Sequence, residues 1–272
     1  EKISFPAPLN KGTLTCMTID NKGNYWVGTR RNGILVYNPV NKAIWTPDKN
    51  LFEPHIINAL QFDGKNNCVW VGTHTAGLFN VDINSKTFTR MRRDDSSPNS
   101  FHSSLINDIT QDKKNNLWVT MLEGGIAKYL ISEPPGKGVT NYELQNGLPD
   151  NNVYGVTAGE DDDIWFTTSK GIGLITADGQ LKSFFNKENG LPYSKFQQSI
   201  ACLPGRKIAS TVENSLFCFD INMVTRPHQS TLIINQVLLR DSVQLKNINH
   251  KFQFNQNTIR LDFVMIDFVS PA

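Results

Sequence analysis

The sequence predicts an all-β protein in which a β-propeller is followed by the start of a β-sandwich. Three observations carry this prediction: a segment centred on tryptophan recurs, each copy contains short alternating strands, and polar turns separate those strands. The recurring tryptophans lie 44 to 48 residues apart, about the length of a four-stranded propeller blade. They are Trp26, Trp70, Trp118 and Trp165. With a weaker copy around Ile208, the chain encodes about five four-stranded blades.

Each copy contains the same four parts in the same order. Alternating hydrophobicity predicts the first strand at 14–19, 57–62, 106–110, 153–157 and 198–203. A turn rich in Asp, Asn, Gly and Lys follows, and the strand with the tryptophan comes next. A third strand and a second turn lead to a fourth strand, which contains Trp45, Phe88, Tyr142 or Phe184.

The repeated tryptophan is best explained by blade stacking. One blade cannot bury both faces of its sheet, so neighbouring blades must pack together and leave the same gap at each interface. A large aromatic side chain fills that gap. We therefore interpret Trp26, Trp70, Trp118 and Trp165 as structural, with a sugar-stacking platform as the minority interpretation.

The repeat pattern ends after Phe219. The predicted division is 1–224 for the propeller blades, 225–230 for a linker with Pro227, and 231–272 for a partial Ig-like β-sandwich. The chain starts at Glu1 and stops at Ala272 within a strand-rich run, so we expect a piece of a longer protein.

Composition and charge exclude several classes of partner. The 27 Lys and Arg residues nearly balance the 25 Asp and Glu residues, so no basic surface for nucleic acid is expected. No apolar run reaches the roughly 18 residues of a membrane helix, and no signal peptide is recognisable. Any membrane contact would come from parts outside this chain.

Catalytic, metal and cofactor chemistry has little support in the sequence. The five histidines and four cysteines lack metal-ligand spacing, so no metal and no cofactor is expected. The acidic runs Asp94-Asp95 and Asp161–Asp163 fit solvated turns better than acid/base or calcium sites. A disulfide between Cys202 and Cys218 is left open. We do not expect this chain to be an enzyme.

Strand parity predicts where a ligand would bind. In a four-stranded meander, the loop between strands two and three lies at the same end of the blade as the connector to the next blade. These are the long, variable segments of this sequence, and function concentrates on such loops. Their guanidinium, imidazole and aromatic groups suit an acidic or hydroxyl-rich sugar. The candidate ligand-binding residues are Arg30, Arg31, His55, His74, Arg92, Arg93, Phe101 and His102.

The repeats also resemble a known family. The run from Asp20 to Pro39 is close to the strand, Asp-x-x-Gly-Asn-x-Trp-Val-Gly-Thr and Gly-x-x-x-Tyr-Asn-Pro order of regulator-propeller repeats. Such repeats form the periplasmic sensor regions of Bacteroides-type hybrid two-component systems. Two Asn-Gly-Leu-Pro connectors, at 146–149 and 189–192, also match. The segment 257–271 resembles the start of the tyrosine-rich sandwich domain of these sensors, with Phe268 where tyrosine is usual.

The resemblance implies a function and a setting. It implies a seven-bladed propeller of which this chain carries part, either as an open arc or as a smaller closed ring. It also implies a periplasmic sensor of oligosaccharides from complex-glycan breakdown. The membrane span, the histidine kinase and the transcription-regulating part would lie outside this chain, and a homodimer of the full receptor stays open. The alternatives are a polysaccharide lyase or hydrolase propeller and a protein-interaction scaffold.

Overall fold

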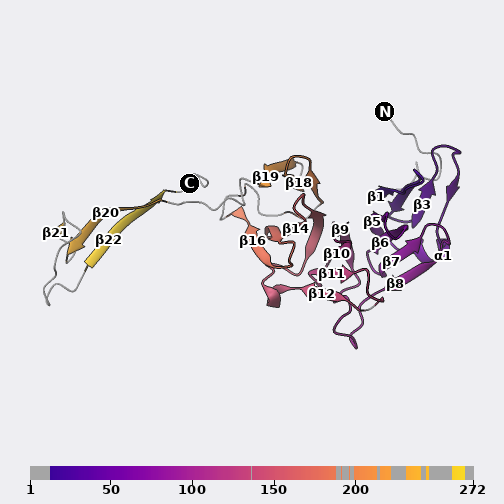
Figure 1. Ribbon diagram of the computed structural model, residues 1–272, viewed down its shortest axis with the longest axis horizontal. Coiled ribbons are helices and arrows are strands. Elements are labelled where there is room, and N and C mark those ends of the chain that lie inside the picture. The colour runs from indigo at the N-terminus through magenta and orange to yellow at the C-terminus, as the bar shows by residue number, and fades with distance from the viewer. Residues whose placement is uncertain are drawn as a thin grey trace. The chain divides into compact units, whose positions relative to one another are not determined.

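The chain folds into two separate β units. The computed structural model describes residues 13–135, 137–187, 191, 196, 199–212, 215–221, 231–239, 243–244 and 259–266. One unit spans Glu1–Ile221 and the other Asn222–Ala272. Strands dominate both units (Figure 1).

The first unit consists of five consecutive antiparallel blades. Four have four strands in sequence order, and the fifth has three strands among the described residues. Blade 1 contains β1 (Leu14–Ile19), β2 (Tyr25–Thr29), β3 (Ile34–Tyr37) and β4 (Ile44–Trp45). Blade 2 contains β5 (Ile57–Asp63), β6 (Cys68–Thr73), β7 (Gly77–Asp82) and β8 (Phe88–Met91). Blade 3 contains β9 (Ile106–Gln111), β10 (Asn116–Met121), β11 (Ile126–Leu130) and β12 (Val139–Tyr142). Blade 4 contains β13 (Val153–Ala158), β14 (Ile164–Thr168), β15 (Gly171–Ile175) and β16 (Leu181–Phe185). Blade 5 contains β17 (Ile200–Leu203), β18 (Lys207–Val212) and β19 (Ser215–Asp220). The expected propeller of about five blades is confirmed.

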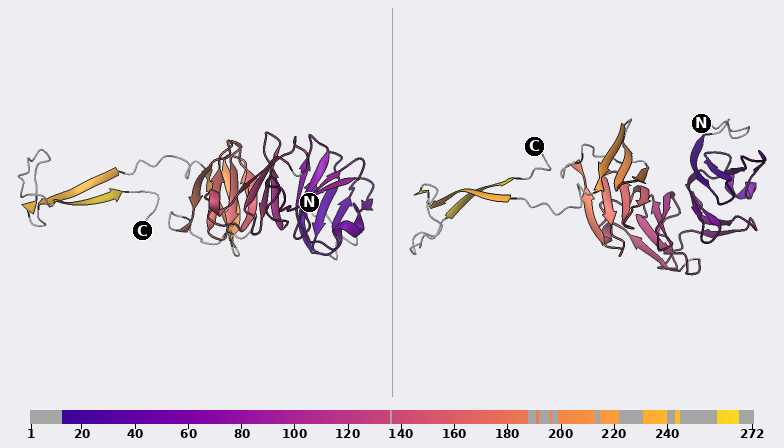
Figure 2. Two further views of the ribbon diagram at one scale, coloured as in Figure 1. Left: turned by 90° about the horizontal axis from the view of Figure 1, so that it is seen from below. Right: turned by 45° about the horizontal axis from the view of Figure 1, so that its top comes forward.

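The blades follow one another in chain order, as the colours of Figure 2 show. The first strands of successive blades are in contact, in the order β1, β5, β9, β13 and β17. A polar side chain repeats this contact at three interfaces. Asn58 Nδ2 donates to the carbonyl of Ile106 at 2.8 Å, and Asn107 Nδ2 donates to that of Val153 at 2.7 Å. The Thr15 hydroxyl donates to the equivalent carbonyl in blade 2. Each bond joins one blade to the backbone of the next blade.

Each tryptophan packs toward the following blade. Trp26 lies in one core cluster with Val69 and Phe79 of blade 2, and Trp118 lies in another with Val156 and Phe166 of blade 4. Trp70 packs with blade 3, where its ring meets Tyr129 edge-on at 5.9 Å. All four tryptophans are at most 2% exposed. Their predicted structural role agrees with this placement.

An aspartate before the first turn holds the indole in place. Asp20 Oδ2 accepts a hydrogen bond from Trp26 Nε1 at 2.9 Å, and Asp112 Oδ2 accepts one from Trp118 Nε1 at 3.0 Å. The same carboxylates accept from the backbone and side-chain amides of an asparagine four residues later. Asp63 has the same position in blade 2, with its Oδ2 at 3.4 Å from Trp70 Nε1. The aspartate thus satisfies the turn and the buried indole together.

Blade 4 departs from this arrangement. Its turn closes with a hydrogen bond from Gly159 N to the carbonyl of Asp163, as Asp112 N bonds to Asn116 in blade 3. Glycine therefore occupies the position of the aspartate. A Cβ at Gly159 would lie 3.5 Å from the indole nitrogen of Trp165.

The glycine of the Trp-Val-Gly-Thr motif permits close blade contact. A Cβ on Gly72 would lie 2.7 Å from Cγ2 of Ile106, in the first strand of the next blade. Gly28 of blade 1 meets Ile57 in the same way, at 2.8 Å. Since real Cβ atoms do not approach that closely, these two positions require glycine for steric reasons.

The turns that join the first and second strands of each blade contact the equivalent turns of neighbouring blades. Lys113 N of blade 3 donates to Asp162 at 2.8 Å, and Gly205 N of blade 5 donates to Glu160 at 2.9 Å. Arg206 forms an ion pair with Asp161. The acidic run of blade 4 is therefore a turn, as expected, but its carboxylates also bind the turns of both neighbouring blades.

Blade 5 presents apolar side chains on its outer surface. Leu203 of β17 is 39% exposed and Leu216 of β19 is 71% exposed.

Cys202 and Cys218 are free thiols. They lie on β17 and β19, with β18 between them. Because a disulfide requires Cβ atoms about 4 Å apart and each strand spacing is already about 4.8 Å, the geometry is incompatible with the bridge left open above.

The second unit contains one described sheet, with strand order β21-β20-β22. These strands are β20 (Thr231–Leu239), β21 (Val243–Gln244) and β22 (Ile259–Ile266). The predicted linker, residues 225–230, lies outside the described residues, as does much of 240–272. The sandwich and the domain limits at 224 and 231 therefore stay predictions.

Replacing Trp70 by alanine is expected to destabilise the propeller by about 3 to 5 kcal/mol, because it leaves a cavity at the interface between blades 2 and 3. Chemical denaturation measures this change. Val40→Ala is the matched control, because Val40 is 88% exposed. Equal unfolding midpoints for Trp70→Ala and the parent would contradict the stacking role of this side chain.

Asp20→Asn is expected to lower stability at pH 7 by on the order of 1 kcal/mol, since the hydrogen bonds to Asp20 are charge-assisted. Burial raises the pKa of Asp20, but hydrogen bonds from Trp26 and Asn24 outweigh it and hold the pKa below its usual range. The charged form therefore stabilises the fold above about pH 4, and this contribution disappears as the pH falls through the folded pKa. Urea denaturation at a series of pH values from about 2.5 to about 7 measures the free energy of unfolding of the parent and the variant. The two free energies should converge in acid. A constant difference would contradict the assignment.

Candidate functional site

The loops between second and third strands share one end of the propeller with the connectors between blades, as strand parity predicts. His74 N, in the loop after β6, donates to the carbonyl of Ile56 in the connector before β5 at 2.9 Å. Leu122 N, after β10, donates to Leu105 at 3.0 Å. Gly77 N donates to Ser104 in the connector from blade 2 to blade 3, also at 3.0 Å. These backbone bonds join the loops and the connectors.

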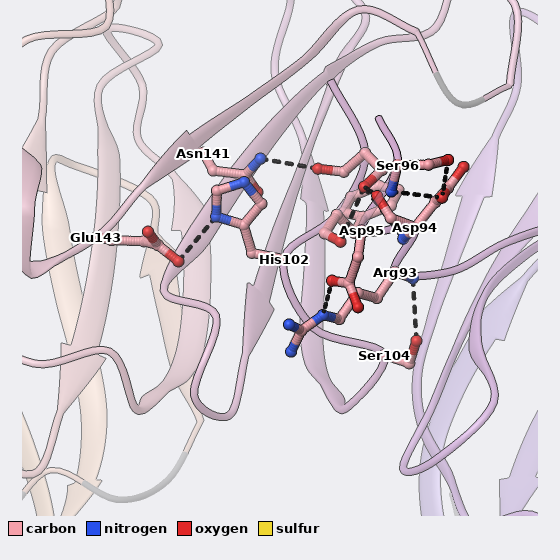
Figure 3. Close-up of polar contacts among 10 residues, drawn as sticks. Arg93, Asp94, Asp95, Ser96, His102, Ser104, Asn141 and Glu143 are labelled. Carbon is pink, nitrogen blue, oxygen red and sulfur yellow. Dashed lines mark hydrogen bonds and ion pairs between the residues drawn. The ribbon is translucent and has the colours of Figure 1, made fainter. Parts of the chain in front are cut away.

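The connector from β8 to β9, residues 92–105, folds back on itself through serine side chains. We call it the connector loop. Ser100 is 4% exposed; its Oγ accepts from Asp94 N at 3.2 Å and donates to the Asp94 carbonyl at 2.8 Å. Arg93 N donates to Ser104 Oγ at 3.1 Å, and the Asp94 carboxylate accepts from Ser96 Oγ at 2.6 Å (Figure 3). Hydrogen bonds from the hydroxyl and the backbone amide of Ser96 hold the pKa of Asp94 below its usual range.

One side of the connector loop borders a cavity of about 380 Å³, which we call the acidic cavity. Four carboxyl groups, one guanidinium and one imidazole line it. The lining residues are Arg93, Asp94, Asp95, Ser97, Pro98, Ser100, Phe101, His102, Glu123 and Glu143. Such a lining suits a ligand with many hydroxyl groups better than an apolar one.

A histidine and a glutamate from different connectors meet in this cavity. His102 Nδ1 lies 2.9 Å from Glu143 Oε1, and Figure 3 shows the two side chains pointing toward each other. Glu143 precedes η2 (Leu144–Asn146) in the connector from blade 3 to blade 4. Its side chain is 14% exposed and that of His102 is 37% exposed. Because an ionised carboxylate only accepts, Nδ1 carries the hydrogen and Nε2 stays available to a ligand.

A second cavity of about 380 Å³ borders the same loop, and we call it the arginine cavity. Three arginines but only one carboxyl group line it. The lining residues are Arg90, Met91, Arg92, Arg93, Asp94, Ser100, Phe101 and Pro135. The two cavities share Arg93, Asp94, Ser100 and Phe101.

The structure separates the eight predicted ligand residues into groups. Four of them, Arg92, Arg93, Phe101 and His102, belong to the connector loop. His55 bonds through Nδ1 to Thr75 Oγ1 at 3.1 Å, next to His74. Burial and then the nearby Arg90 charge lower the pKa of His55, so it is neutral at pH 7. The guanidiniums of Arg30 and Arg31 are exposed and form no hydrogen bond or ion pair with the residues that the structure describes.

Phe101 differs from the expected apolar platform. It is 2% exposed and packs in the core between blades 2 and 3, with its ring 6.3 Å from that of Tyr129. Little of the ring is left for a sugar to stack on. Phe101 instead anchors the connector loop to the scaffold.

Several cavity residues were missed by sequence reasoning. Glu123, Glu143 and Arg90 lie on separate loops and strands, and only folding brings them to the connector loop. Glu143 carried one signal, since it starts a polar turn before an Asn-Gly-Leu-Pro connector. Nothing in the local sequence of Arg90 distinguishes it from a solvated strand residue.

Asp108 is a partly buried titratable group on β9 and lines neither cavity. Its Oδ2 accepts from Val156 N of blade 4 at 3.1 Å, and its Oδ1 accepts from Ile109 N at 2.9 Å. Burial raises its pKa to about 6 despite these bonds. It therefore joins blades 3 and 4. In the described part of the chain, no three His, Cys, Asp or Glu side chains are grouped as a metal site.

No protein-family model matches this chain, and no curated protein matches its sequence. Solved structures do match. The extracellular domain of the hybrid two-component system BT4673 from B. thetaiotaomicron has 17% identity and a TM-score of 0.62, over 77% of this chain and 30% of that one. The extracellular domain of the system BT3049 from the same organism has 19% identity and a TM-score of 0.50, over 93% and 41%.

Virginiamycin B lyase from Staphylococcus aureus also matches, with 20% identity and a TM-score of 0.57, over 76% of this chain and 70% of the lyase. The chain has the propeller fold of these proteins. It spans less than half the length of either two-component domain. Within the described residues, no helix has the length and apolar character needed to cross a membrane.

Ser100→Ala is expected to loosen the connector loop without unfolding the blades, because the hydroxyl bonds both the N–H and the carbonyl of Asp94. Amide hydrogen exchange should become at least tenfold faster at residues 94–97, a local loss of about 1.4 kcal/mol. Exchange in β10 should not change. Ser85→Ala, which removes an exposed turn hydroxyl, is the control. Unchanged exchange at 94–97 would contradict the role of Ser100.

Proposed function

We propose that this chain is a ligand-sensing domain of a hybrid two-component receptor, that it lies in the periplasm, and that it binds an oligosaccharide. The observation that carries the proposal is the pair of polar cavities built on the connector loop, at the end of the propeller where loops and connectors meet. The similarity in fold to extracellular domains of two such systems supports it. The kinase and the DNA-binding part lie outside this chain in this proposal.

The acidic cavity has the chemistry of a sugar site. Carboxylates accept hydrogen bonds from sugar hydroxyls, and so does the free Nε2 of a neutral imidazole such as His102, while the guanidinium of Arg93 donates to sugar oxygens. The serine bonds of the connector loop fix this wall before a ligand arrives, which lowers the entropic cost of binding. Relay of the signal would then follow from a shift between arrangements of the receptor rather than from bond chemistry.

The double variant Arg93→Ala/His102→Ala is expected to weaken binding of the cognate oligosaccharide at least tenfold, or about 1.4 kcal/mol, because both side chains line the acidic cavity. Isothermal titration calorimetry measures the affinity. The melting temperature should change little, since both side chains are partly exposed.

The triple variant Arg30→Ala/Arg31→Ala/His74→Ala tests the predicted ligand residues in the loops that follow β2 of blade 1 and β6 of blade 2. If the triple variant loses affinity and the cavity variant keeps it, the site lies over those blades and not at the connector loop. If an unbiased panel of oligosaccharides gives no binding to the parent, the sensor proposal itself is wrong.

A polysaccharide lyase or hydrolase is the second candidate, and the contact between His102 and Glu143 is the observation that favours it. A carboxylate that orients an imidazole is a common element of general acid–base catalysis. The fold similarity to virginiamycin B lyase is compatible with an enzyme. Product formation from the oligosaccharide that binds, lost in Glu143→Gln, would favour the enzyme. Binding without turnover favours the sensor.

A further inference from the structure

The two cavities of the connector loop differ sharply in charge. The arginine cavity is lined by three arginines, Arg90, Arg92 and Arg93, and by one carboxyl group, that of Asp94. The acidic cavity is lined by four carboxyl groups, one arginine and one histidine. The loop therefore separates a basic compartment from an acidic one, and the shared residues Arg93 and Asp94 mark the boundary. One ligand that spans both compartments must present different chemistry to each.

Part of the positive charge of the arginine cavity is not paired with a carboxylate of the described residues. Arg93 Nε is paired with Asp95 at 2.6 Å, but Arg92 has no hydrogen bond or ion pair among the described residues. The carboxylate of Asp94 accepts hydrogen bonds from the amide and hydroxyl of Ser96, and it attracts the charge of Arg92 without forming an ion pair with it. At least the guanidinium of Arg92 is thus available to an incoming anion.

Arg90 is held in position before any ligand binds. Its Nε donates to the carbonyl of Ala76 at 2.7 Å, and its guanidinium lies over the ring of Phe79, 5.4 Å from the centroid. These contacts leave its terminal nitrogens to bind an anion. No carboxylate of the described residues pairs with it. The neighbouring His55 is neutral at pH 7 and does not add to the charge.

Guanidiniums recognise planar or tetrahedral oxyanions through paired N–H donors, and carboxylates recognise hydroxyls. From this juxtaposition we infer that the connector loop binds a saccharide that carries an anionic group, a carboxylate or a sulfate ester, with that group in the arginine cavity. The neighbouring neutral sugar ring occupies the acidic cavity. This inference rests on the proposed function and narrows its ligand class.

The test is a panel of immobilised oligosaccharides in matched pairs that differ only in charge. Uronate oligosaccharides are paired with their methyl esters, and sulfated oligosaccharides with their desulfated forms. We expect binding to charged members only, and weaker binding at higher salt because the attraction is screened. The two kinds of pair distinguish a carboxylate from a sulfate.

Variants then locate the anion. Arg92→Ala is expected to weaken binding of the charged oligosaccharide at least tenfold, and Arg92→Lys to recover part of the loss because lysine keeps the charge but not the paired donors. Lys65→Ala removes one positive charge from an exposed turn between β5 and β6, and is expected to leave the affinity unchanged. Circular dichroism confirms that each variant is folded.

The outcomes separate the two proposals. Equal binding of both members of each pair, or equal affinity in Arg92→Ala and the parent, overturns the anionic inference and leaves the saccharide sensor intact. Binding to no saccharide overturns the proposed function and the inference with it. Equal losses in Arg92→Ala and Lys65→Ala would assign the effect to net charge alone and also overturn the inference.

Discussion

The hydrogen bond from the blade tryptophan to the aspartate before the turn is the interaction on which the rest of the propeller depends. An indole N–H buried without an acceptor would cost part of what the large ring gains by burial. In blades 1 to 3 one carboxylate satisfies the indole and also the turn amides. The ring is therefore fixed in one orientation, and the next blade can pack against a defined surface. In blade 4, where Gly159 replaces this aspartate, the carboxylates of Asp162 and Glu160 in the turn accept hydrogen bonds from backbone amides of the neighbouring blades.

The two ends of the propeller differ in structure: one has short turns that join neighbouring blades, and the other carries the proposed binding site. At the end with the short turns, residues of adjacent blades hydrogen-bond to each other, and carboxylates of blade 4 accept from backbone amides of blades 3 and 5. At the other end, longer connectors cross between blades, and their length gives room for the connector loop. Core packing of Phe101 and the hydroxyl of Ser100 hold that loop, which allows charged side chains to stay exposed on a rigid support. Binding surfaces on loops over a rigid scaffold are common for this reason.

Comparison with solved structures supports the fold but does not by itself select a function. Extracellular domains of two hybrid two-component systems and a lyase share this architecture with the chain at similar identity. The distinction therefore depends on side chains at the loop end. There, an oriented imidazole and several carboxylates are compatible with binding and with acid–base chemistry, whereas Arg90 and Arg92, which pair with no carboxylate of the described residues, favour the proposed recognition of an anion. The charge contrast across one loop is the basis of the proposed ligand class.

The sequence alone determined the repeat, the strand order, the structural tryptophans and the end of the propeller that carries the long loops. These are local properties: hydrophobic alternation, turn residues and a fixed period are all readable within one blade. The site was only half predictable. Arg92, Arg93 and His102 lie in one loop and were found together, but Glu123, Glu143 and Arg90 reach the cavities from other elements. Whether Phe101 faces a ligand or the core was likewise decided by packing against Tyr129, because burial depends on what the neighbouring blade presents and not on the residues beside it in sequence.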